Sequence, residues 1–184
     1  DSQMNMVDQN VMTIEQKPAV HRTVGRIQTN MPLYPQVIQS TLSWIDTQRD
    51  HMLDQVKSLC EINSYSANAP GVNRYLDHVE PTLRALTDDI ERIKLNPVKS
   101  IDDNGREVTT IVGDALLARA RRDAPFRVLL NIHSDTVYPE SDPFPIKQID
   151  ENTLNGPGVI DARGGLVVML TALKALEQSK LAPF

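Results

Sequence analysis

The chain has 184 residues, with 19 Lys and Arg against 24 Asp and Glu and a formal net charge of −5. Hydrophobic residues make up 40% of it and aromatic residues 4%, an ordinary globular composition that excludes collagen, a coiled coil and a chain disordered throughout. The mildly acidic balance gives no electrostatic reason to expect nucleic acid or an anionic membrane as a partner.

A polar segment precedes two helical patterns. Residues 1–31 are rich in Met, Gln, Asn and Thr and show no sustained period, so we expect an extension with little core of its own. From Val37 the apolar residues recur at helical spacing to about Cys60, which predicts a helix. A second helix is predicted over 72–86, after a loop of small and polar residues. Pro81 should kink this helix or end it.

The pattern then changes to a period of two. Alternating residues over 90–95 predict a strand. The stretch 102–105 contains Asn-Gly, which supplies the positive φ angles of a tight hairpin turn and predicts a return strand over 108–112. Residues 115–120 are expected to extend the same sheet. We interpret the arginine-rich stretch 119–122 as a solvated sheet edge rather than a binding patch.

The most strand-like run of the chain is 126–132, which is almost continuously apolar, as is typical of a strand buried on both faces. A proline-rich loop follows, and then a short hairpin is predicted around 150–152. A glycine-rich turn at 156–165 opens the last predicted helix, whose apolar residues over 166–176 share one side. Helices, strands and a central buried strand together predict an α/β sandwich.

Cys60 is the only cysteine, which excludes an internal disulfide and a cysteine metal cluster. It follows Leu59 in a periodic apolar stretch, so we interpret it as a small buried hydrophobe. No apolar run reaches the length of a membrane span, and the polar residues 1–10 do not resemble a signal peptide. We expect a soluble protein, and its compartment stays open between cytoplasmic and periplasmic or secreted.

Four of the eight glycines lie within 156–165. This stretch is not a dinucleotide-binding fingerprint, because Asp161 stands where the third glycine belongs, and it is not a P-loop, because no Gly-Lys-Ser/Thr follows. What remains is a carboxylate presented on a glycine turn just before a helix. The positive end of that helix favours an ionised Asp161.

A second cluster, His133-Ser134-Asp135, follows the apolar run. If the strand persists, His133 and Asp135 point to one face, at the carboxyl end where open α/β sheets bind ligands. Asp135 could accept the second N–H of a metal-ligating His133, and Asp161 could bring an oxygen ligand. Imidazole and carboxylate without thiolate suit a hydrolytic zinc or related divalent site. A His-x-Asp motif alone, or an Asp before a helix alone, more often has a structural role. The two motifs in this order along the chain are a more specific sign of a metal site.

These motifs resemble the signature of the aminoacylase and acetylornithine deacetylase metallopeptidase family, which includes succinyl-diaminopimelate desuccinylase and glutamate carboxypeptidase. The resemblance covers about residues 50–180. Its Asp-Thr-Val-Tyr and Gly-Pro-Gly segments are most similar to those of the glutamate carboxypeptidases. The residues that carry it are His133-Ser134-Asp135-Thr136-Val137, Pro143-Phe144 and Gly156-x-Gly158-x-x-Asp161-x-Arg163-Gly164-Gly165.

The resemblance implies a role for each matching residue. His133 would ligate one metal ion, Asp161 would bridge two zinc ions, and Asp135 would be the catalytic residue that orients and polarises His133. Co²⁺ or Mn²⁺ could replace Zn²⁺. The two ions would activate a bridging water and polarise the scissile carbonyl, with a glutamate as general base. The Asp161–Ala162 peptide bond would be cis. Arg163 stands where the family commonly has Lys.

The resemblance also implies a three-layer α/β sandwich with a mixed, largely parallel sheet, in which residues 32–184 form the N-terminal part of the catalytic domain. The general base, the remaining ligands and a dimerisation or lid domain are expected beyond Phe184. No adjacent acidic pair in this chain can take the place of the one that carries the general base. We interpret Asp88-Asp89 as residues at a helix end or in a loop, and Asp102-Asp103 as hairpin-turn residues. We therefore expect the 184-residue chain alone to bind metal weakly and not to turn over substrate.

Three functions stay open at this stage. The first is release of a terminal amino acid from a small peptide or N-acyl amino acid by a zinc-dependent hydrolase. The second keeps the fold and removes an N-acetyl or N-succinyl group. The third is a non-catalytic binding or scaffold module with half a metal site. The expected partners are small substrates, with no nucleic acid and no membrane, and a homodimer would form through a domain absent from this chain.

Overall fold

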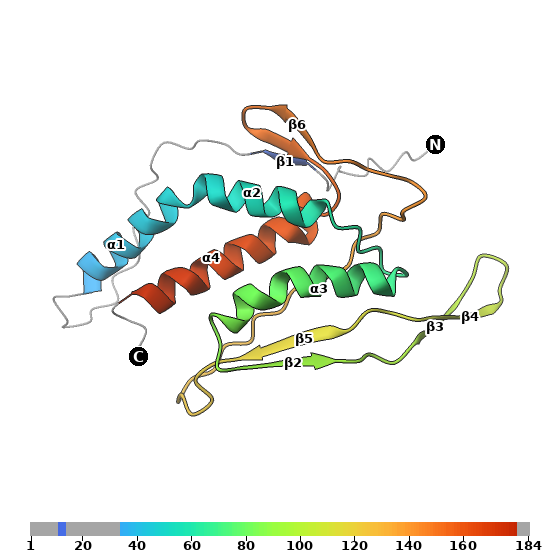
Figure 1. The fold of residues 1–184 in the computed structure, drawn as a ribbon, viewed down its shortest axis with the longest axis horizontal. Helices are drawn as coiled ribbons and strands as arrows, with labels where there is room; N and C mark the ends of the chain where they lie inside the picture. The colour runs from blue at the N-terminus through green and yellow to red at the C-terminus, as the bar shows by residue number, and fades with distance from the viewer. Residues whose placement is uncertain (1–10, 14–33, 180–184) are drawn as a thin grey trace, which may run out of the picture.

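The computed structural model describes residues 11–13 and 34–179, and these form a mixed α/β fold of helices and small antiparallel sheets (Figure 1). The helices are α1 (Tyr34–Thr47), α2 (Arg49–Cys60), α3 (Ala69–Arg84) and α4 (Gly165–Gln178). The strands are β1 (Val11–Thr13), β2 (Asp89–Ile93), β3 (Val98–Ile101), β4 (Glu107–Thr110), β5 (Ala115–Arg119), β6 (Lys147–Asp150) and β7 (Thr153–Asn155).

The single helix predicted from Val37 to Cys60 is divided into α1 and α2. Gln48 lies between them with φ −89° and ψ 0°. Thr47 Oγ1 donates to the Trp44 carbonyl at 2.6 Å, and Gln48 N donates to the Ile45 carbonyl at 2.9 Å. These bonds reach back three residues and tighten the end of α1. The apolar period therefore continues across a break in the helix.

Helix α3 runs through Pro81 and ends at Arg84, one turn later. Its first turn is capped by Asn68, whose side chain accepts a hydrogen bond from Gly71 N at 3.0 Å. This cap satisfies one of the free N–H groups at the helix start. The expectation that Pro81 ends or kinks the helix is met only in that the helix stops soon after it.

The core lies where α2, α3 and α4 meet the turn before α4 (Figure 1). Cys60 is 5% exposed, and burial raises the pKa of its thiol to about 11. The interpretation of Cys60 as a buried hydrophobe is thereby confirmed. The buried members of the core are Val56, Leu59, Cys60, Tyr75, Leu76, Val79, Leu154, Val159, Leu166, Val167 and Leu170.

Both predicted hairpin turns form, but the strand that pairs with the return strand of the first hairpin is β3 and not the strand predicted over 90–95. Strands β3 and β4 pair around Asp102, whose Oδ1 accepts from Asn104 N at 2.9 Å and Arg106 N at 2.8 Å. Strands β6 and β7 pair in the second hairpin, and β1 adds to the other edge of β7. Of the predicted extension 1–31, residues 11–13 thus form a strand, and the rest lies outside the described residues.

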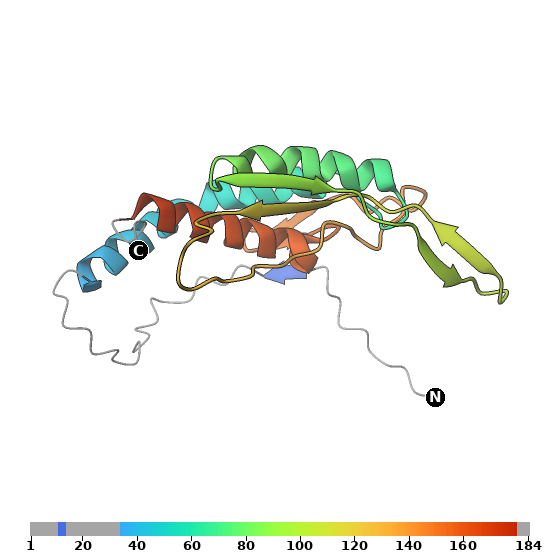
Figure 2. The same ribbon diagram turned by 90° about the horizontal axis from the view of Figure 1, so that it is seen from below.

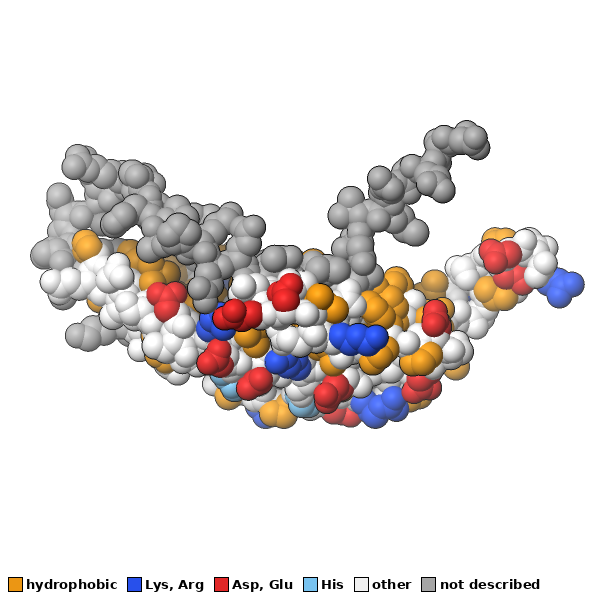
Figure 3. Space-filling view, turned by 90° about the horizontal axis from the view of Figure 1, so that it is seen from above, with side chains coloured by type: hydrophobic (Ala, Val, Ile, Leu, Met, Phe, Trp, Pro, Cys, Tyr) orange, Lys and Arg blue, Asp and Glu red, His pale blue; other side chains and the backbone are white. Residues whose placement is uncertain are grey.

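The strand predicted over 115–120 is β5, and it pairs with β2 in antiparallel register. The expectation that it extends the sheet of the hairpin is wrong, because β2 and β5 form a sheet separate from that of β3 and β4. Arg119 forms ion pairs with Asp89 and Glu91, both at 3.0 Å, and Arg121 pairs with Glu177 of α4 at 2.6 Å. The arginine-rich stretch is therefore engaged in surface ion pairs, in agreement with a solvated sheet edge. On the face seen in Figure 3, acidic, basic and apolar side chains are interspersed.

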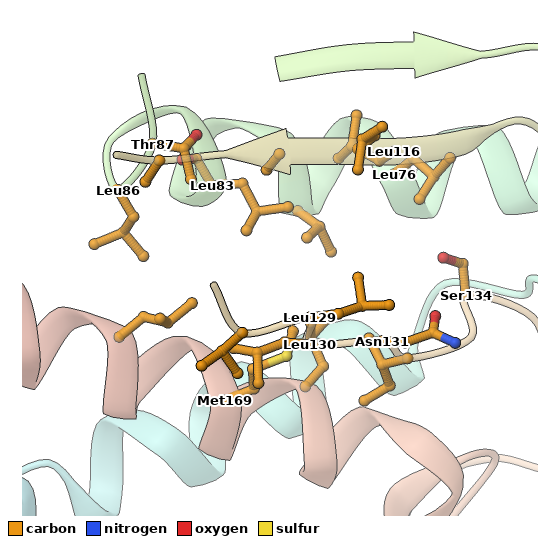
Figure 4. A pocket seen from close by; sticks show the side chains of 18 of the residues that line it. Leu76, Leu83, Leu86, Thr87, Leu116, Leu129, Leu130, Asn131, Ser134 and Met169 are labelled. Carbon is orange, nitrogen blue, oxygen red and sulfur yellow. The ribbon is translucent and has the colours of Figure 1, made fainter. Parts of the chain in front are cut away.

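The prediction of a buried central strand over 126–132 is wrong for this structure. The segment pairs with none of the described strands, and Phe126, Val128 and Leu129 are 89%, 83% and 85% exposed. An apolar run becomes a buried strand only where neighbouring strands supply its ladder hydrogen bonds, and here it lacks them. Instead, Leu129 lies along a groove of about 300 Å³ between α4 and the layer of α3 and β5 (Figure 4).

The described strand pairs are antiparallel, and the one parallel contact among them is an isolated bridge between Tyr65 and Thr136. The three-layer sandwich with a largely parallel sheet therefore stays a prediction. Among the described helices, none combines the length and the apolar character needed to cross a membrane.

Candidate metal centre

The three predicted site residues lie together. His133 Nε2 is 2.7 Å from Asp161 Oδ1, although 28 positions separate the two residues. On the other side of the ring, Nδ1 is 3.2 Å from Asp135 Oδ1 and 3.0 Å from the Asp135 carbonyl oxygen. The imidazole is therefore held between two carboxylates.

Asp161 reaches His133 from the turn Val159–Gly164 (η1), which precedes α4. The backbone of Asp161 is non-helical, with φ −116° and ψ 90°, and the Asp161–Ala162 peptide bond is cis, as the resemblance implies. Gly158 opens the turn with φ 72°, and a Cβ there would lie 3.1 Å from Thr136 Cγ2. A glycine at this position lets the turn pack closely against the segment that carries His133.

The site is open to solvent. The side chains of His133, Asp135 and Asp161 are 46%, 41% and 63% exposed. The hydrogen bond to Asp161 raises the pKa of His133 above its ordinary value, burial of the ring opposes this, and Asp135 adds to the rise. Negative charge on both sides of the ring thus favours a cation at Nε2, either a proton or a metal ion.

The donor types suit zinc, which binds imidazole nitrogen and carboxylate oxygen. The donor number is smaller than a complete site needs: the described residues hold no group of three or more His, Cys, Asp or Glu side chains placed to bind an ion. His133 and Asp161 place two candidate donors together, whereas zinc sites use three or four protein ligands. Asp135 is placed to hold His133 from behind.

A buried arginine joins the two halves of this site. Arg163 is 1% exposed, and its guanidinium donates to the Ser134 carbonyl at 3.0 Å and to Ser64 Oγ. It also lies over the Tyr75 ring, 3.8 Å from the centroid. Arg163 therefore connects the turn of Asp161 to the segment of His133. The planar fork that reaches two acceptors and stacks on a ring is specific to arginine.

The loop between α2 and α3 is part of the site and was missed by sequence reasoning. Ser66 Oγ donates to Asp135 Oδ2 at 2.5 Å, across 69 positions of sequence. Ser64 Oγ donates to the Ser134 carbonyl at 2.9 Å. Neither period nor spacing pairs such distant residues. The only available signal was that this loop is rich in Ser and Asn.

The other two described histidines lie on helix surfaces. His51 and His78 are exposed on α2 and α3, and His78 Nε2 lies 3.4 Å from Ser58 Oγ. His21 lies outside the described residues. Asp102 is used by its own hairpin turn, in agreement with a structural role.

A family model described as Peptidase family M20/M25/M40 matches residues 129–183. This range includes His133, Asp135 and Asp161. The match supports assignment to the M20 peptidase superfamily, without selecting a subfamily, and it indicates a metallopeptidase or amidohydrolase that acts on peptide or amide bonds. The comparison with curated proteins found no match.

Proposed function

We propose that this chain contributes His133, Asp135 and Asp161 to the zinc site of a hydrolase that releases a terminal amino acid from a small peptide or an N-acyl amino acid. The observation that carries the proposal is the convergence of His133 Nε2 and Asp161 Oδ1 at 2.7 Å. It occurs within the range that the peptidase family model matches. The proposal retains the three-layer sandwich as the expected complete fold.

Each residue has a role that follows from its contacts. Asp135 accepts the Nδ1–H of His133 and so fixes the tautomer that leaves the Nε2 lone pair free for a metal. Asp161 supplies a carboxylate oxygen beside that lone pair and offsets the charge of a divalent ion. When bound, such an ion polarises the scissile carbonyl and lowers the pKa of a bound water. The further ligands and the general base must come from outside the described residues.

Binding of Co²⁺ to the 184-residue chain tests this proposal. We expect weak binding, because two protein donors are fewer than a complete site provides. His133→Gln should remove that binding, since glutamine lacks the imidazole nitrogen. His78→Gln is the matched control, because it changes an exposed histidine on α3. Equal Co²⁺ affinity in the two variants would exclude His133 as a ligand.

A further inference from the structure

A hydroxyl group outside the predicted site lies against its central carboxylate. Ser66 Oγ donates to Asp135 Oδ2 at 2.5 Å, and the other oxygen of that carboxylate lies 3.2 Å from His133 Nδ1. The Asp135 carboxylate thus accepts from the serine on one oxygen, and its other oxygen shares the Nδ1–H of His133 with the Asp135 carbonyl oxygen, which lies at 3.0 Å. The series of contacts ends at Asp161, 2.7 Å from His133 Nε2.

The backbone holds Ser66 in register with the site. Tyr65 and Thr136 form a parallel bridge. Thr136 N donates to the Ser64 carbonyl at 2.9 Å, and Ser66 N donates to the Thr136 carbonyl at 3.0 Å. These main-chain bonds fix the Cα of Ser66, so the position of its hydroxyl does not depend on the side chain alone.

The hydroxyl has one proton to donate and two acceptors within reach. Asp135 Oδ2 lies at 2.5 Å and the Thr136 carbonyl oxygen at 3.2 Å. Hydrogen bonds to an ionised acceptor are shorter and stronger than bonds to a neutral one. The hydroxyl therefore donates to the carboxylate rather than to the Thr136 carbonyl. This bond fixes the rotation of the Asp135 carboxylate and directs its second oxygen toward His133.

We infer that Ser66 is a positioning residue of the metal centre. It orients Asp135, and Asp135 in turn holds the Nδ1–H of His133 so that Nε2 faces the metal. The inference rests on the proposed function and adds a residue that the motif does not contain. A hydroxyl that only stabilised the loop would affect the stability of the protein and leave its metal affinity unchanged.

The test compares Co²⁺ affinity in the wild-type chain, Ser66→Ala and Ser66→Thr, with folding checked by circular dichroism. Removing an outer partner of a ligand weakens metal binding by about 10–100-fold. Because Ser66 acts one bond further out, we expect Ser66→Ala to weaken Co²⁺ binding by about 3–10-fold. Ser66→Thr retains the hydroxyl and should restore the wild-type affinity.

A double-mutant cycle separates positioning from a general structural effect. In an Asp135→Asn background, Ser66→Ala should cause no further loss of affinity, because the serine acts through that carboxylate. Ser58→Ala is the matched control. It removes a hydroxyl that lies beside a different histidine, His78, and should leave Co²⁺ binding unchanged.

The same variants have a readout that needs no metal. The ¹⁵N resonance of His133 Nδ1, recorded at one pH, reports the hydrogen bond to Asp135. Ser66→Ala and Asp135→Asn should move this resonance in the same direction. Ser58→Ala should leave it in place. This readout decides the question even where the Co²⁺ affinity is too low to measure.

Two results would overturn the inference while leaving the proposed function intact. One is an equal loss on Ser66→Ala in the wild-type and Asp135→Asn backgrounds. The other is a Ser66→Ala variant with wild-type affinity and an unmoved His133 resonance. By contrast, Co²⁺ binding that persists in His133→Gln removes the proposed function, and the inference with it.

Discussion

Gly158 determines how closely the Asp161 turn approaches its neighbours. Its φ of 72° is unfavourable for a residue with a side chain. A Cβ at this position would lie 3.1 Å from Thr136 Cγ2 and 3.3 Å from Arg163 Cγ. Both neighbours belong to the segments that the turn brings together, so a methyl group here strains the backbone and separates the two halves of the site.

Replacing Gly158 by alanine should therefore lower the free energy of unfolding by more than the backbone strain alone would. Gly105 is the matched control, because its φ is 76° and a Cβ there meets nothing within 4 Å. We expect Gly105→Ala to lower the free energy of unfolding by about 1–2 kcal/mol, and Gly158→Ala to lower it further, as measured by urea denaturation. Equal losses in the two variants would show that the turn has room for a methyl group.

The site residues that the sequence predicted are those that belong to local motifs. His133, Asp135 and Asp161 follow from donor type and spacing, and the structure brings them together. Ser66 and Tyr75 do not follow, because their contacts with Asp135 and Arg163 arise only when distant segments fold together. Such contacts are set by tertiary structure and leave no periodic signal in a single sequence.

At the scale of elements, the correct predictions are those whose cause is local. The hairpin of β3 and β4 forms at the Asn-Gly turn, where Gly105 alone of the two adopts a positive φ, 76°. The helix α4 follows from its own apolar stripe. The segment 126–132 depends instead on strands beside it, and its apolar composition alone did not decide its structure.

The exposure of Leu129 gives this difference a direct test. Leu129 is 85% exposed and Leu154, in β7, is 1% exposed. Leu154→Ala should lower the free energy of unfolding by about 2–5 kcal/mol through the cavity it leaves. Leu129→Ala should change it by less than about 0.5 kcal/mol, as surface substitutions usually do. A comparable loss in both variants would instead support the buried strand that the sequence predicts.

At the scale of the whole molecule, the described residues divide into a packed body and a projecting arm. Helices α2, α3 and α4 share the buried core, and the candidate metal centre lies at its edge. The hairpin of β3 and β4 extends away from these helices (Figure 2). All residues of β3 are exposed, and β3 pairs with β4 alone among the described strands.

Hydrogen exchange should separate these two parts. A two-stranded hairpin without a packed face is marginally stable, so the amides of β3 and β4 should exchange by local opening. The pair β2 and β5 is an internal control, since it is also two-stranded but is half-buried beside α3. We expect β2 and β5 amides to be protected well beyond those of β3 and β4, and core amides of α3 and α4 to exchange most slowly. Equal protection of the two strand pairs would contradict this division. It would mean that the β3–β4 hairpin is packed against other parts of the protein in solution and does not project from the core of α2, α3 and α4.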